Sequence, residues 1–287
     1  MVATWGARIA WLAVAVLGGE AIGDALSSHS RPVQVTGTVG AWITWGVVAL
    51  ALLVPSTVSL TVVRTIVPAA VVASVLAAVE SDDAVAAVTC VALSVLALAM
   101  VAVGEFGQSF AQASAYGDER RFVLRPPVAY LVAAALSWCV LCAVALAGPL
   151  LLAAGAWALG LPLTVLAVAL AVYLGRRFHR LSRRWAVLVP AGIVVHDHLV
   201  LAETAMFPRR TLRHVALALA GTEAADLTGP AAGMAVEIGL TDVPTVVLAP
   251  SRAAPRGTAL HVRSVLIAPS RPGRMLAEAA RRRFPVG

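Results

Sequence analysis

The 287-residue chain contains no lysine and few charged residues of any kind. Only 13% of its residues are charged and 60% are hydrophobic, whereas a soluble globular domain is roughly 25% charged and about half apolar. This composition excludes an ordinary soluble protein and indicates a membrane protein. All the positive charge is arginine, which together with the frequent Ala and Val indicates a GC-rich genome and no particular function.

Cysteine is also scarce, and the three cysteines all lie in apolar stretches, which excludes a disulfide framework. Cys139 and Cys142 form a CxxC pair, which carries electrons in membrane thiol oxidoreductases. A redox site needs a cation or a helix N-terminus to lower the thiol pKa, and neither is evident near the pair. We therefore favour packing of ordinary small apolar residues, and keep a thiol-redox enzyme as the weakest alternative.

Long apolar runs dominate the first part of the chain, residues 1–175, and predict about six transmembrane helices. A secretory signal that is removed is the minor alternative for the first run, which follows Arg8. The predicted spans are residues 9–26, 39–54, 57–79, 84–104, 128–148 and 150–175.

Arginine placement predicts the orientation of these spans. With both termini in the cytoplasm, the inner segments hold nearly all the arginines of this region, and the outer segments hold only Arg31 together with the acidic Glu80, Asp82 and Asp83. The positive-inside rule favours this arrangement over its reverse. We therefore predict a multi-pass protein of the inner (plasma) membrane, and we assign the net charge of +7 to lipid headgroups and topology rather than to nucleic acid.

Residues 176–184 form a basic juxtamembrane linker. We interpret it mainly as a stop-transfer anchor and, as the alternative, as a binding site for anionic lipid headgroups. Its arginines are Arg176, Arg177, Arg180, Arg183 and Arg184.

The remaining residues, 185–287, have no run long enough to span a membrane and predict a β-rich α+β domain of typical size. Short β-branched runs alternate with Gly, Pro and Asp, and a run of helix formers follows Ser270. The predicted strands are residues 186–189, 193–195, 199–203, 211–219, 234–240, 245–248 and 259–267.

The order of these elements resembles the bacterial membrane-anchored pleckstrin-homology-like domains. The resemblance is carried by RRWAVLVPAGIVVHD at the start of the domain and SVLIAPSRPGRMLAEAARRRF at its end. It implies a curved sheet in a β-barrel or sandwich closed by the last helix, and a binding or assembly role without catalysis. Pro190-Ala191-Gly192 is short and uncharged, so phosphoinositide recognition is not implied. The first four spans lie outside the resemblance.

The motif His196-Asp197-His198 is the main candidate for chemistry in this domain. Histidines two apart on a strand can point to one face and bind a metal, but a zinc site needs three or four protein ligands. No nearby motif supplies the others, so we predict the polar tip of a β-hairpin and neither a metal nor a cofactor.

Charges within the spans are the other candidates. Glu20 and Asp24 are four residues apart, so they share a helical face; they either begin a proton or cation path or, as we favour, mark the end of a span. Arg64 and Glu105 both fall toward the inner side and could pair.

The inner loop between the fourth and fifth spans carries Asp118-Glu119-Arg120-Arg121. We interpret this cluster as a solvated tip, with docking on the C-terminal domain as the alternative. The sequence shows no phosphate-binding loop, zinc-protease helix or nucleophile elbow. The favoured function is a non-catalytic, membrane-tethered adaptor or scaffold that binds a protein partner or anionic headgroups. A small-solute or ion transporter with a regulatory domain is the alternative.

Overall fold

The computed structural model describes residues 2–250 and 254–287, which form two compact units. The helical unit comprises Met1–Phe110 and Ala134–His179, and the β-rich unit comprises Ala111–Ala133 and Arg180–Gly287. The β-rich unit is therefore discontinuous in sequence. It takes in the loop between the fourth and fifth spans as well as the C-terminal region expected to begin at Trp185.

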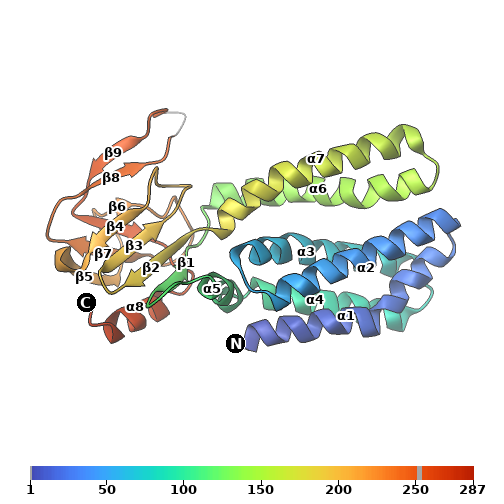
Figure 1. Cartoon of the computed structure of the whole chain (residues 1–287), viewed down its shortest axis with the longest axis horizontal. Coiled ribbons are helices and arrows are strands. Elements are labelled where there is room, and N and C mark those ends of the chain that lie inside the picture. The colour runs from blue at the N-terminus through green and yellow to red at the C-terminus, as the bar shows by residue number, and fades with distance from the viewer. Residues whose placement is uncertain (1, 251–253) are drawn as a thin grey trace. The chain divides into compact units, whose positions relative to one another are not determined.

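Among the described residues, six helices are long and apolar enough to cross a membrane, which confirms the prediction of a polytopic membrane protein. Apolar side chains cover their outer surfaces, as a lipid-facing surface requires. A short helix, α5 (Gly104–Ala113), follows the fourth span. The six helices, drawn in Figure 1, are α1 (Val2–Ser27), α2 (Arg31–Leu53), α3 (Thr57–Glu80), α4 (Ala84–Ala102), α6 (Val128–Ala153) and α7 (Trp157–Ser182).

Local sequence sets the ends of these helices and the closeness of their packing. Ser56 and Asp83 cap α3 and α4 by accepting hydrogen bonds from backbone N–H groups of the first turn. Small residues bring backbones together: a Cβ added at Gly148 would lie 2.7 Å from the Thr164 backbone nitrogen. Helix α6 continues through Pro149 to Ala153. It therefore ends five residues after Gly148, where the sequence predicts the end of this span.

In the β-rich unit, the residues that the structure describes form two four-stranded sheets and a two-stranded ribbon. In the first sheet, β1 (Arg120–Val123), β2 (Trp185–Val189), β3 (Gly192–His196) and β4 (Ala205–Pro208) pair antiparallel in chain order. The second sheet has the order β5-β7-β10-β6, with β5 (Leu212–Leu217), β6 (Ala225–Asp226), β7 (Val236–Leu240) and β10 (Ser264–Ile267). The ribbon pairs β8 (Thr245–Leu248) with β9 (Thr258–His261).

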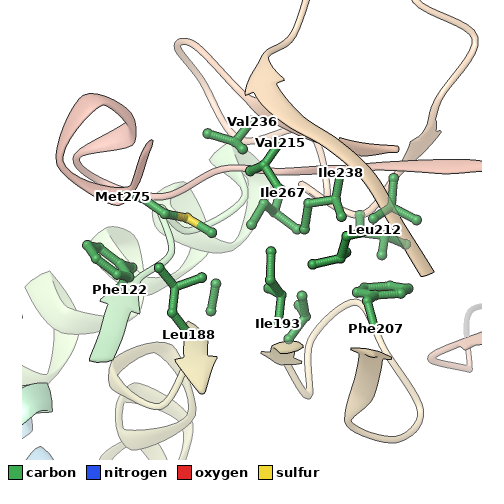
Figure 2. Packing of buried hydrophobic residues seen from close by; sticks show 14 of the residues in the cluster. Phe122, Leu188, Ile193, Phe207, Leu212, Val215, Val236, Ile238, Ile267 and Met275 are labelled. Atoms are coloured by element: carbon green, nitrogen blue, oxygen red, sulfur yellow. The ribbon is translucent and has the colours of Figure 1, made fainter. Parts of the chain in front are cut away.

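The core of this unit lies between the two sheets and the final helix, α8 (Pro272–Arg281). Phe122, Leu188 and Ile193 of the first sheet face Val215 and Ile238 of the second, as Figure 2 shows. Met275 of α8, which is fully buried, enters the same cluster. Apolar side chains of both sheets build this core: β2 is buried along most of its length, whereas β5 alternates between buried and more exposed positions.

Two details of the predicted β-rich domain are wrong, and of the predicted barrel or sandwich only the packing of two sheets on one core is seen. Residues 199–203 form a turn and an isolated bridge instead of a strand, and the return strand is β4, five residues or so later. Residues 259–267 form parts of two strands, β9 and β10, because Val262 and Arg263 between them are not in strand conformation. Within the described residues the strands do not close into a barrel.

Candidate functional site

The basic linker, residues 176–184, forms the last turns of α7 and the residues just after it, and it presents four exposed arginines. Arg176, Arg177 and Arg180 lie on the last turns of α7, and Arg183 follows directly. The guanidinium of Arg177 lies over the ring of Tyr173, 5.0 Å from its centroid. Cations at a helix C-terminus are favoured by the helix dipole, and here they follow an apolar span. This is the geometry expected of a segment at headgroup depth.

Arg184 differs from its neighbours because its side chain is buried inside the β-rich unit, with 1% exposed. Its Nε donates a hydrogen bond to Asp197 Oδ1 at 2.7 Å, and Nη2 donates to Oδ2 at 2.6 Å. This two-pronged geometry is the strong form of an Arg–carboxylate pair. Arg184 therefore belongs to an internal ion pair, and its assignment to lipid headgroups is corrected.

The same ion pair joins three separate chain segments. Arg184 Nη1 donates to the carbonyl oxygen of Arg125 at 2.7 Å, just before α6 begins. Asp197 Oδ1 also accepts from the backbone N–H of Leu199 at 3.1 Å, which fixes the turn after β3. The pair thus connects the residues before α6, a residue just after the end of α7 and the turn after β3. We call Arg184, Asp197 and the Arg125 carbonyl the buried node.

His196-Asp197-His198 lies where β3 ends and the connection to β4 begins, as expected of a hairpin, but its side chains are packed and paired. His196 is the last residue of β3, and its ring stacks on Trp185 with a centroid distance of 5.1 Å. The His198 ring meets the His196 ring edge-on at 4.2 Å, and His196 Nδ1 is 3.0 Å from the Thr204 hydroxyl oxygen. Burial is the largest cause that lowers the pKa of His196 to about 4, with the positive charge of a protonated His198 and of Arg183 next. His196 is neutral at pH 7.

A metal at this motif would need further ligands beside the two histidines. Among residues 2–250 and 254–287, no group of three His, Cys, Asp or Glu side chains converges. Asp197 is engaged by Arg184, so its oxygens are already occupied by donors. The His-Asp-His motif acts as a packing and ion-pair element in this geometry.

The inner loop docks on the C-terminal region, so our preferred interpretation of its tip as merely solvated is wrong. Strand β1, which includes Arg120 and Arg121, pairs antiparallel with β2. Arg121 Nη2 donates to Glu119 at 2.7 Å, and its guanidinium lies 5.1 Å from the Trp185 ring centroid. Asp118 accepts from Arg282 at 2.8 Å, which ties the loop to the end of α8.

Within the helical unit, the predicted intramembrane charges have different surroundings. Asp24 accepts hydrogen bonds from the Ser81 hydroxyl at 2.7 Å and from the Asp82 backbone N–H at 2.9 Å. It holds the α3–α4 connection, as expected of a residue that marks the end of a span. Glu20, one turn earlier on the same helix, is exposed.

Arg64 and Glu105, the other predicted pair, lie in the α3 and α5 regions of the same unit. A Cβ at Gly107 would lie 2.5 Å from Arg64 Nη2, so glycine at this position makes room for the guanidinium. Cys90, Cys139 and Cys142 are free thiols, and Cys139 and Cys142 are not bridged.

Sequence reasoning missed two polar contacts in this unit. Arg8 donates from Nε and Nη2 to the carbonyl oxygen of Leu52, at 3.0 and 2.9 Å, near the end of α2. Trp11 and Trp45 each donate an indole N–H to the other's backbone carbonyl, at 3.0 and 2.9 Å. The arginine and tryptophans are visible in the sequence, but their carbonyl partners carry no side-chain signal.

A wide, shallow depression of about 410 Å³ lies elsewhere on the β-rich unit. It is lined by Thr222, Glu223, His261 and Arg263 among others, and His261 Nδ1 is 3.0 Å from the Thr245 hydroxyl oxygen.

No protein-family model matches the chain, and the searches of curated proteins and of solved structures found no significant match.

Proposed function

We propose that this chain is a membrane-tethered adaptor of the inner membrane, with both termini and the β-rich unit on the cytoplasmic side. In this proposal the exposed arginines of the basic linker bind anionic lipid headgroups and keep the unit at the membrane face. The observation that carries the proposal is the set of four exposed arginines directly after an apolar span, Arg176, Arg177, Arg180 and Arg183. The positive-inside rule supports the orientation.

A pleckstrin-homology-like fold for the β-rich unit is part of the same proposal. The antiparallel first hairpin, the second sheet and the final helix that packs into the core support it. The open arrangement of the two described sheets counts against full similarity. An adaptor of this kind would present a binding surface, for lipid or for a protein partner, and would not need a reaction centre.

Lipid retention tests the proposal. The full-length protein is purified from membranes in mild detergent, and the ratio of anionic to zwitterionic lipid that remains bound is measured by mass spectrometry. Replacing Arg176, Arg177, Arg180 and Arg183 with Gln should lower this ratio, because each basic residue near a charged membrane surface contributes about 1 kcal/mol.

The matched control removes the same number of charges from exposed arginines elsewhere in the β-rich unit. It carries Gln at Arg210, Arg213, Arg256 and Arg263, all of which are exposed. The control should retain the anionic lipid. Equal loss in both variants, or no loss in either, would contradict headgroup binding by the linker.

A further inference from the structure

An uncharged, apolar loop on the β-rich unit projects exposed side chains into solvent. Residues 227–236 read LTGPAAGMAV and connect β6 to β7. Pro230, Ala232 and Met234 are exposed, and Met234 has 64% of its surface accessible. Exposed loops of soluble domains are usually rich in polar residues, so this stretch needs another explanation.

The neighbouring strand β5 extends the same apolar surface. The buried side of the sheet runs along Val215, but Leu217 and Leu219 continue it beyond the core and are 44% and 80% exposed. The backbone N–H of Ala218 donates to the carbonyl oxygen of Ala235 at 3.0 Å, which places Leu219 beside Met234. We call Leu217, Leu219, Pro230 and Met234 the apolar rim.

The apolar rim is held against the first residue of α6. The backbone N–H of Val128 donates to the carbonyl oxygen of Pro230 at 3.4 Å, and the Arg125 guanidinium donates to the carbonyl oxygen of Met234. Gly229 has φ +63°, and a Cβ there would lie 3.0 Å from the Pro127 ring. These contacts lie within the β-rich unit, which includes the first turns of α6.

The first residues of α6 have the kinds of side chain expected at a membrane boundary. Val128, Tyr130 and Leu131 are about half exposed, at 47%, 49% and 53%. Tyrosine is enriched at the interface between headgroups and acyl chains, and arginine precedes it here on the predicted cytoplasmic side. The loop that carries Pro230 and Met234 therefore lies against the start of a helix that is long and apolar enough to cross a bilayer.

We propose that the apolar rim inserts into the boundary between headgroups and acyl chains, beside the point where α6 enters the membrane. The occupant of this surface is lipid of the same membrane in which α6 lies. Burying exposed Leu and Met side chains is favourable because it removes apolar surface from water, and it requires no anionic headgroup. The inference requires α6 to span the membrane but does not depend on headgroup binding by the basic linker.

Fluorescence quenching tests the insertion in the full-length chain. Cys90, Cys139 and Cys142 are replaced with Ala, and Met234→Cys supplies a single cysteine. An environment-sensitive dye is attached to this cysteine, and the protein is placed in nanodiscs of phosphatidylcholine alone. The dye should emit at shorter wavelength and be quenched by a lipid with a nitroxide near the top of its acyl chain. Aqueous iodide should quench it weakly. Neutral lipid separates this result from any binding of anionic headgroups.

The control is Met206→Cys in the same background, because Met206 is also an exposed methionine, on β4 of the first sheet. Its dye should be quenched by iodide and not by the lipid nitroxide. Strong iodide quenching at position 234 would overturn the proposal. Shielding there from both quenchers would also overturn it, because it would indicate a protein partner or a second copy as the occupant. Equal lipid quenching at both positions would show no specific insertion and have the same consequence.

Discussion

At the residue scale, Arg184 and Asp197 are the most consequential pair in the β-rich unit. Both side chains are removed from water, so each charge depends on the other for the interactions that replace hydration. Arg184 also donates to the backbone carbonyl of Arg125, and Asp197 also accepts from the backbone N–H of Leu199. The buried node therefore determines how the chain leaves α7 and turns after β3.

Replacing one member of this pair should destabilise the protein strongly. Arg184→Met or Asp197→Leu alone leaves a buried, uncompensated charge, for which a loss of about 3–5 kcal/mol is expected. The double variant removes both charges and should recover most of that loss. The apparent melting temperature in detergent, followed by tryptophan fluorescence, measures the three variants. Losses in the double variant that equal the sum of the single losses would contradict the pairing.

His196 should make the stability of the β-rich unit depend on pH. Its pKa is about 4 in the folded protein and about 6.5 when unfolded. Between these values the unfolded state binds more protons, so stability is complete above about pH 6.5 and falls as the pH drops toward 4. The groups that influence it are His198, Arg183, Asp197 and Arg121.

The measurement is the apparent melting temperature between pH 7 and pH 4.5, compared with a His196→Gln variant that cannot titrate. The wild-type chain should lose more stability across this interval than the variant. Matching pH dependence in the two proteins would show that His196 does not remain neutral through burial.

At the element scale, strand β1 is the part of the β-rich unit that comes from far away in the sequence. Phe122 of β1 is buried in the core beside Leu188, so the inner loop contributes hydrophobic packing as well as backbone hydrogen bonds. Phe122→Ala should cost about 3–5 kcal/mol. It should also increase hydrogen exchange at the backbone N–H groups of β2.

Tyr116→Ala is the control for this prediction, because Tyr116 lies in the same loop and is 91% exposed. It should leave exchange in β2 unchanged. Unaltered protection of β2 in the Phe122→Ala variant would contradict the contribution of the loop to this sheet.

Much of the element pattern follows from local sequence. The six apolar helices, the turn at Pro190-Ala191 and helix α8 were predictable from hydrophobic runs, turn residues and helix formers. Strand β1 was not predictable, because RRFV is short and forms a strand only by pairing with β2, more than sixty residues later in the sequence. For the same reason Arg184 could not be separated from the other linker arginines: its partner is set by the register of β2 and β3.

At the scale of the whole molecule, the described residues combine six helices long and apolar enough to cross a membrane with a β-rich unit built from two sequence segments. The two segments belong to one compact unit, so the loop after α5 and the region after α7 must lie on the same side of the membrane. That requirement agrees with an even number of spans, α6 and α7, between them. In our proposal this shared side is the cytoplasm, which the positive-inside rule favours.

Cysteine accessibility in spheroplasts tests this topology most directly. Cys90, Cys139 and Cys142 are first replaced by Ala. A single cysteine is then placed either at Ser28, between α1 and α2, or at Tyr116, in the β-rich unit. Both positions are exposed. A membrane-impermeant maleimide should label the cysteine at position 28 in intact spheroplasts. It should label position 116 only after the membrane is opened by detergent. Labelling of position 116 in intact spheroplasts, with protection of position 28, would contradict the cytoplasmic placement of the β-rich unit.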